Sequence, residues 1–244
     1  MQLKFVVIFL LCYSTANATC TSPCVAATTF AATSGSVTSP AINTTGATLL
    51  VVTANCFVCY STNSTTAPTD NKSNTTRWLV TGLFNAGSNF GNTMIWYFWN
   101  PNVGAGHTIT WNAGGTTFAG VTFAAYSGVQ ISSNPLDQVS AGSAGAATTC
   151  SPGSITPSSS TELIVTVLSP GSLTSSYLIN SSFTISGTIA FNSSVNFPEA
   201  TAYRLASAAV NPQWSWTGSQ AAPCTMASFF QAPTSNQNKS HLIR

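Results

Sequence analysis

Carboxylates and histidines, the side chains that most often catalyse hydrolysis, are scarce in this chain. Only four of its 244 residues are Asp or Glu, and two are His. Glycoside hydrolysis requires two carboxylates that face one bond. No two of the four lie at i, i+2 spacing on one strand, so Asp137 and Glu162 could meet only through the fold.

A Ser–His–acid arrangement has little more support. His241 lies near the polar C-terminus, and His107 follows Gly106 at the start of a short β-branched run, which predicts a solvated strand end. No Gly-x-Ser-x-Gly elbow is present. We therefore expect a protein without catalytic activity.

One segment, 70–74, gathers oxygen-bearing side chains of the kind that calcium prefers. Its members are Asp70, Asn71, Ser73 and Asn74. A single carboxylate is few for a calcium site, and an ordinary polar turn is the favoured interpretation. We expect no bound metal and no cofactor.

The cysteines predict disulfides. Cys12 lies in an apolar N-terminal run, and the other six are Cys20, Cys24, Cys56, Cys59, Cys150 and Cys224. An even number of cysteines favours disulfides wherever a chain is exported. We expect Cys150 to pair with Cys224 and the first four to pair among themselves. A four-cysteine zinc site from the Cys-x3-Cys and Cys-x2-Cys pairs is an alternative with suitable spacing, but an oxidising environment disfavours it.

Two tryptophans are the candidate ligand-binding residues. Trp214 and Trp216 lie at i and i+2, so on a strand they share one face. Indole rings on a shared face could stack on a sugar. The run 94–99 differs because both of its faces are apolar, which predicts burial between two layers.

Seven Asn-x-Ser/Thr sequons follow residue 18, slightly more than a Ser/Thr-rich composition would produce by chance. Their asparagines are Asn43, Asn63, Asn71, Asn74, Asn180, Asn192 and Asn238. Sequons of this type accept N-linked glycans in secreted proteins. We therefore expect a glycoprotein in which attached sugars compensate for the missing surface charge.

The N-terminus has the features of a secretory signal peptide. Lys4 is followed by an apolar run at 5–13 and by the motif Ala16-Asn17-Ala18. The run is too short to span a bilayer, so we expect cleavage after Ala18 and a secreted or cell-surface protein without a later transmembrane segment. The expected organisation is a signal peptide at 1–18, a β-sandwich domain at 19–230 and a polar C-terminal tail at 231–244.

Charge is also sparse in the expected mature chain. Five basic and four acidic residues follow residue 18, a net charge of +1. This balance excludes the basic face that nucleic acid requires. The chain contains 34 Ser and 36 Thr, while recurring Val, Ile, Leu and aromatic residues argue against disorder. The partners we consider are glycans and other copies of the same chain.

The sequence predicts that the candidate residues are positioned by β-strands. Short β-branched and aromatic runs separated by Gly, Asn and Pro predict strands and turns. The runs are 47–56, 77–84, 94–99, 108–111, 118–126, 161–168, 176–191, 199–209 and 224–230, with one or two edge strands within 19–46. The continuous apolar run 47–56 is typical of a central strand buried on both faces. The Gly- and Ser-rich segment 127–160 is typical of a long loop. We predict an all-β fold, a single antiparallel jelly-roll-like sandwich of about ten strands.

Several segments resemble a secreted β-sandwich domain that is widespread in bacterial, archaeal and phage surface proteins. They are 37–42 with 49–52, 70–78, 126–129 with 135–137, and Tyr203-Arg204, spread over roughly residues 30–230. The resemblance implies a concanavalin-like or jelly-roll sandwich on an exported protein, and it implies no catalytic residues.

The leading expectation is a secreted structural or adhesive protein. A carbohydrate-binding module that uses Trp214 and Trp216 is one alternative. A filament subunit is another, in which residues 19–33 add a strand to the sheet edge of a neighbouring copy.

Overall fold

The computed structural model describes residues 20–32, 36–56, 67–75, 77–82, 92–112, 119–171, 175–189 and 198–233. Within these ranges the chain forms fourteen strands and no helix, as predicted for an all-β protein. None of them provides a helix long and apolar enough to cross a lipid bilayer. The expected signal peptide, and the predictions for Asn63, Cys59, Asn192, Asn238 and His241, lie outside the described residues.

The strands follow one another along the whole described chain. They are β1 (Cys24–Ala32), β2 (Ser36–Thr38), β3 (Leu49–Cys56), β4 (Thr69–Asp70), β5 (Arg77–Gly82), β6 (Asn92–Trp99), β7 (Ile109–Asn112), β8 (Ala119–Tyr126), β9 (Leu136–Cys150), β10 (Glu162–Leu168), β11 (Ser175–Ile179), β12 (Thr184–Ile189), β13 (Glu199–Ala206) and β14 (Trp214–Phe230).

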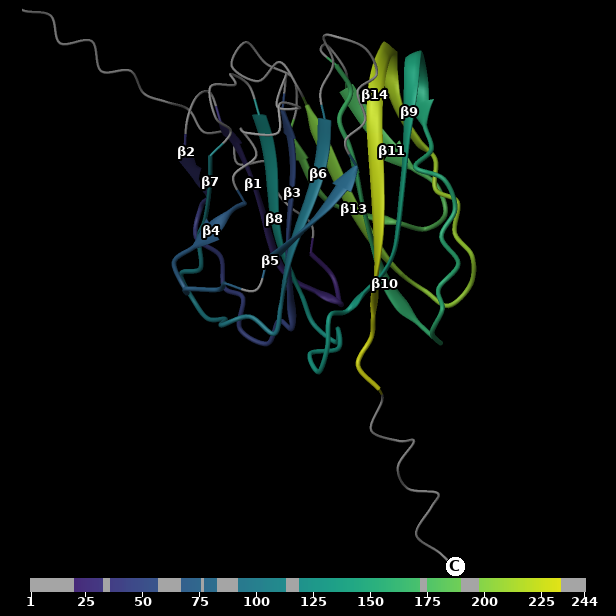
Figure 1. Cartoon of the computed structure of the whole chain (residues 1–244). Helices are drawn as coiled ribbons and strands as arrows, with labels where there is room; N and C mark the ends of the chain where they lie inside the picture. The colour runs from purple at the N-terminus through teal and green to yellow at the C-terminus, as the bar shows by residue number, and fades with distance from the viewer. Residues whose placement is uncertain are drawn as a thin grey trace, which may run out of the picture.

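Two large antiparallel sheets pack face to face, which confirms the sandwich (Figure 1). One has the order β1-β8-β3-β6-β5, and the other has the order β11-β14-β10-β13-β12, with β9 paired to β14. The apolar run 47–56 supplies β3, which lies at the centre of the first sheet with Val51 opposite Tyr97 on β6 and Ala124 on β8. The prediction of a buried central strand is therefore correct.

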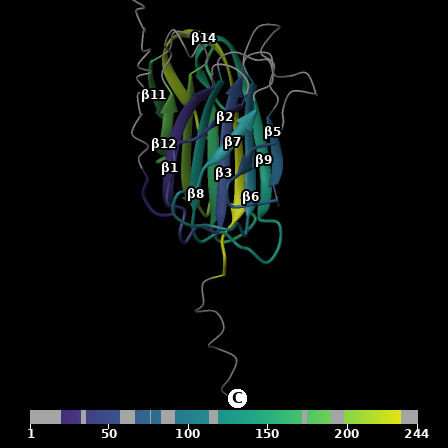
Figure 2. The ribbon, with the colours of Figure 1, turned by 90° about the vertical axis from the view of Figure 1, so that its left-hand side faces the viewer.

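A small third sheet, β2-β7-β4, covers the outer face of the first sheet (Figure 2). Trp111 on β7 packs against Trp96 on β6, with ring centroids 5.8 Å apart. Side chains on the opposite face of β6 meet the second sheet instead, where the rings of Tyr97 and Phe229 are 5.1 Å apart. Apolar residues on both faces of β6 are thus explained by two separate cores. A third core lies on the far face of the second sheet.

Residues 136–150 form a strand, so the prediction of a long loop over 127–160 is wrong there. This strand, β9, is 15 residues long and pairs with β14, with Thr225 opposite Ala141 and Ala227 opposite Val139. Its Gly, Ala and Ser residues have low intrinsic strand preference. Long-range pairing with the 17-residue β14 supplies the backbone hydrogen bonds that a local pattern could not indicate.

Two disulfides join described cysteines. Cys150 pairs with Cys224, as predicted, and Cys20 pairs with Cys24. The second bond removes two of the four ligands that the alternative zinc site requires, so that site is excluded. The bonds are characteristic of an oxidising environment. The side chain of Cys56 lies outside the described residues.

The N-terminal strand belongs to the chain's own sheet. Strand β1 pairs along its length with β8, with Phe30 opposite Val121. The segment before it is tied to the second sheet, because the Tyr203 hydroxyl donates to Thr21 O at 2.6 Å and accepts from Thr21 N at 2.9 Å. Residues 21–32 therefore complete their own sandwich and are not an unpaired strand.

Candidate functional site

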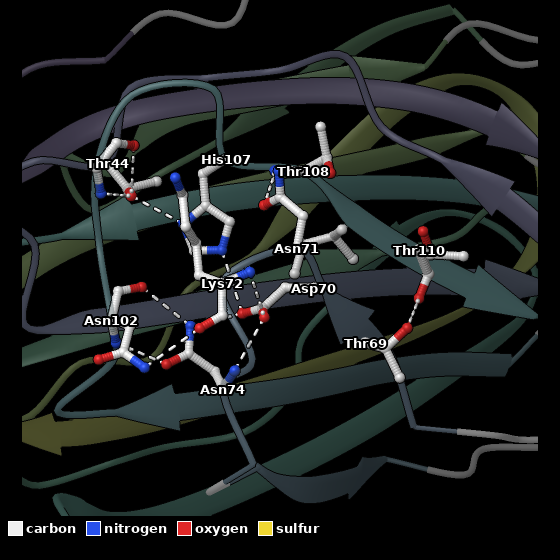
Figure 3. Close-up of polar contacts among 12 residues, drawn as sticks. Thr44, Thr69, Asp70, Asn71, Lys72, Asn74, Asn102, His107, Thr108 and Thr110 are labelled. Carbon is white, nitrogen blue, oxygen red and sulfur yellow. Dashed lines mark hydrogen bonds and ion pairs between the residues drawn. The ribbon is translucent and has the colours of Figure 1, made fainter.

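A polar cluster of Thr44, Asp70, Asn74, Asn102 and His107 is the best candidate for a functional site (Figure 3). We call it the Asp70–His107 cluster. The Asp70 and His107 side chains are both fully buried, and Nε2 of His107 lies 3.1 Å from Oδ2 of Asp70. On the other side of the ring, Nδ1 lies 2.9 Å from Oγ1 of Thr44. An acid, an imidazole and a hydroxyl are thus connected in one chain of hydrogen bonds.

Asp70 is positioned by the turn that follows β4. Its Oδ1 accepts the backbone N–H groups of Lys72 and Asn74, both at 3.0 Å. Ser73 between them has a φ of 61°, the left-handed conformation that such a turn requires. The favoured interpretation of 70–74 as a polar turn is therefore correct.

Asn74 connects this turn to the loop before β7. Its Nδ2 donates to Oδ2 of Asp70 at 2.6 Å and to the carbonyl of Asn102 at 3.0 Å, and its Oδ1 accepts the Asn102 N–H at 2.6 Å. Lys72 supplies a second connection, because its Nζ donates to the carbonyl of Ala105 at 3.0 Å. These two residues thus fasten the turn after β4 to the loop before β7.

His107 is fully buried, so the prediction of a solvated strand end is wrong. A backbone bridge to Ile42 holds the residue, and the ring packs edge-on against Phe123 with centroids 5.4 Å apart. The contact places the imidazole under the first sheet, in the space that the small sheet encloses. The long-range pairing of Ile42 with His107 contributes to this placement, and no local sequence pattern indicates it.

Hydrogen bonds determine the charge state of Asp70. Burial alone raises the pKa of this carboxyl, but the donors from His107, Asn74 and Lys72 outweigh burial and hold the pKa below its ordinary value. The Thr44 hydroxyl can serve either state of the ring. It can donate to Nδ1 of a neutral imidazole, or accept from a protonated one while donating to the carbonyl of Gly104, 3.2 Å away.

The order of groups resembles an acid–histidine–nucleophile relay, but the environment does not permit hydrolysis. Thr44 is fully buried, and its oxygen also accepts the N–H of Gly104 at 3.0 Å. A nucleophile must reach a substrate carbonyl, and this hydroxyl has no exposed surface. The cluster therefore acts as internal support for the third sheet. No group of three or more His, Cys, Asp or Glu side chains among the described residues could hold a metal ion.

Asp137 and Glu162 meet in space, which the sequence left open. The backbone N–H of Ser158 donates to Oε1 of Glu162 at 2.9 Å and lies 3.3 Å from Oδ2 of Asp137, and the Ser158 hydroxyl donates to Oδ1 of Asp137 at 2.9 Å. Glu162 is fully buried. A carboxyl without exposed surface cannot reach a glycosidic bond, so the pair anchors the turn before β10.

A second buried carboxyl, Glu199, lies between the two large sheets. Its Oε1 accepts the hydroxyls of Thr53 at 2.7 Å and Thr201 at 3.0 Å. Burial raises the pKa of Glu199 to about 8, although the hydroxyls of Thr53, Thr122 and Thr201 oppose the shift. The carboxyl is therefore largely protonated in the folded protein at neutral pH.

Trp214 and Trp216 are buried in the core on the far face of the second sheet, so their prediction as a sugar-stacking platform is wrong. They share a face as expected, but that face is covered by the third core. The Trp214 indole N–H donates to the hydroxyl of Thr166 at 3.1 Å. Stacking on a sugar requires an exposed ring face, which neither residue offers.

The described sequon asparagines differ in exposure. Asn43, Asn71 and Asn180 are exposed, whereas Asn74 is buried. The sequence could not distinguish them, because the motif is the same at all four positions. The chain matches no protein-family model, no curated protein and no solved structure.

Proposed function

We propose that the chain is a secreted, glycosylated extracellular or cell-surface protein with a structural or adhesive role and no catalytic activity. The observation that carries this proposal is the engagement of its ionisable groups. The side chains of Asp70 and His107 are buried, as are Glu162 and Glu199, and these groups accept or donate hydrogen bonds that hold strands and turns together. Because these ionisable groups are buried, Ser, Thr and Asn supply most of the polar groups at the surface.

The disulfides support an extracellular address. They close loops in a chain that has almost no surface ions to keep it soluble, and hydroxyls with attached sugars would replace that charge. The direct test is antibody labelling of intact, unpermeabilised source cells or particles. Labelling is expected without permeabilisation, and signal that appears only after lysis would contradict the proposal.

A second candidate function is assembly into an extracellular filament, which strand β9 favours. One edge of β9 pairs with β14, and no described residue pairs with its other edge. Residues 138–150 contain no charge and no proline, two of the features that protect an edge strand from pairing with another chain. Another copy of this chain is the partner we consider, joined by strand addition at β9.

Electron microscopy of purified protein tests this candidate with one substitution. Ala141 is an exposed position of β9, so Ala141→Lys should place a charge on the edge and abolish polymers while the monomer stays folded. Wild-type protein that remains monomeric at high concentration would exclude the filament.

A further inference from the structure

The hydrogen bonds of the sequon asparagines determine which of them can carry a glycan in the folded protein. We propose that Asn43 and Asn180 are glycan-bearing positions and that Asn74 is a structural asparagine that stays unmodified. The inference rests on the proposed secretion of the chain. It concerns the Nδ2 atom of each residue, because that atom forms the bond to the sugar.

The chemistry of the modification sets the criterion. The bond from Nδ2 to the anomeric carbon of the sugar forms as that carbon's bond to a lipid-linked pyrophosphate donor breaks. The lipid pyrophosphate leaves, and one amide proton is released. No oxidation or reduction takes place. A glycosylated asparagine therefore keeps one N–H, so a residue that needs both amide hydrogens cannot be modified without losing a bond.

Asn43 meets the criterion. It is exposed, and its Oδ1 accepts the backbone N–H of Thr45 at 3.1 Å and the hydroxyl of Thr45 at 2.8 Å. No described residue accepts a hydrogen bond from its Nδ2. The carbonyl oxygen thus fixes the side chain in a local turn, while the nitrogen is available for the sugar.

Asn180, directly after β11, has the same arrangement. It is exposed, and its Oδ1 accepts the backbone N–H of Gln213 at 2.8 Å and the hydroxyl of Ser181 at 3.0 Å. Within the described part of the chain its Nδ2 donates to no acceptor. A glycan at Asn180 would extend from the turn without disturbing the β11–β14 pairing.

Asn74 fails this criterion, and it is also buried. It is only 9% exposed, and its two amide hydrogens donate to Asp70 and to the carbonyl of Asn102. A sugar on Nδ2 would remove one of these donors and occupy the space of the Asp70–His107 cluster. Asn71 lies between the two cases, because it is exposed and its Nδ2 makes one bond, to Gly106 O at 2.8 Å, which the remaining hydrogen can keep.

The transferase acts on the chain before it folds, so a glycan at Asn74 has a predictable consequence. That species would be unable to form the cluster and would be retained during secretion. The secreted, folded fraction should therefore carry sugar at Asn43 and Asn180 and none at Asn74.

Glycopeptide mass spectrometry of the full chain, secreted from a eukaryotic host, tests the inference. Enzymatic removal of N-glycans in heavy-oxygen water should label Asn43 and Asn180 and leave Asn74 unlabelled. Labelled Asn74 in the secreted fraction, or unlabelled Asn43 and Asn180, would overturn the inference. A chain retained in the cell in all forms would count against the proposed secretion, which separates the two failures.

Matched substitutions provide a second measurement that does not depend on the transferase. In protein from a host without N-glycosylation, Asn74→Gln should lower the melting temperature by several degrees, whereas Asn43→Gln, which affects only an exposed local turn, should lower it much less. Equal melting temperatures for the two variants would contradict the structural role assigned to Asn74.

Discussion

Replacing Glu199 with Gln should change how the stability of this protein depends on pH. The Glu199 carboxyl is fully buried between the two sheets, where Thr53 and Thr201 donate to it. Glutamine keeps the size and the carbonyl acceptor of a protonated glutamic acid, but it has no proton to lose. The variant therefore removes the titration and keeps most of the packing.

The magnitude follows from the raised pKa. Burial shifts the Glu199 pKa from 4.5 to about 8. Each unit corresponds to about 1.4 kcal/mol, so the full shift is worth on the order of 5 kcal/mol. Because the folded state holds its proton more tightly than the unfolded state, this stabilisation is complete below pH 4.5. It declines as pH rises and is lost once pH passes the folded pKa near 8.

Urea denaturation at several pH values measures this directly. The free energy of unfolding of wild-type protein should fall between pH 5 and pH 8, whereas that of Glu199→Gln should stay nearly constant. Any advantage of wild type over the variant at pH 5 should therefore be several kcal/mol smaller at pH 8, or reversed. Both proteins should have the same dependence on urea concentration, which shows that they unfold to the same extent. Parallel pH profiles would refute the buried, protonated carboxyl.

The remaining predictions concern the disulfides and the Asp70–His107 cluster. Replacing Cys150 and Cys224 by Ser should cost about 4 kcal/mol, and replacing Cys20 and Cys24 only about 2 kcal/mol, because the bonds close loops with sequence separations of 74 and 4; equal losses in urea would contradict this loop-length argument. The depressed pKa of Asp70 means that its stabilisation is present above the ordinary carboxyl pKa and is lost as pH falls through the folded value. Melting temperatures from pH 7 to pH 2 should therefore fall less steeply for Asp70→Asn than for wild type, and identical slopes would argue against the cluster.

Local sequence patterns predicted the strands whose residues carry their own signal. The apolar run that contains Leu49 and Val51 favours a strand enclosed on both sides, and the structure places it at the centre of the first sheet. Strand β9 carries no such signal, because Ala, Gly and Ser pack in many conformations. Its existence depends on β14, which lies far along the chain.

The Asp70–His107 cluster could not be predicted from the sequence for a similar reason. His107 and Asp70 are 37 residues apart, and their partner Thr44 is 63 residues from His107. A bridge between Ile42 and His107 brings these segments together, and nothing near any one residue indicates it. Trp214 and Trp216 show a different limit of local patterns. Their i, i+2 spacing correctly placed them on one face of a strand, but spacing alone does not say whether that face is buried.

Thiol labelling of protein isolated from its source tests the central claim, an exported sandwich fastened by disulfides, most directly. Alkylation without reduction, followed by mass spectrometry, should leave Cys20, Cys24, Cys150 and Cys224 unmodified, in a chain that begins at Thr19. Alkylated cysteines at these positions in a chain that still carries residues 1–18 would contradict the account.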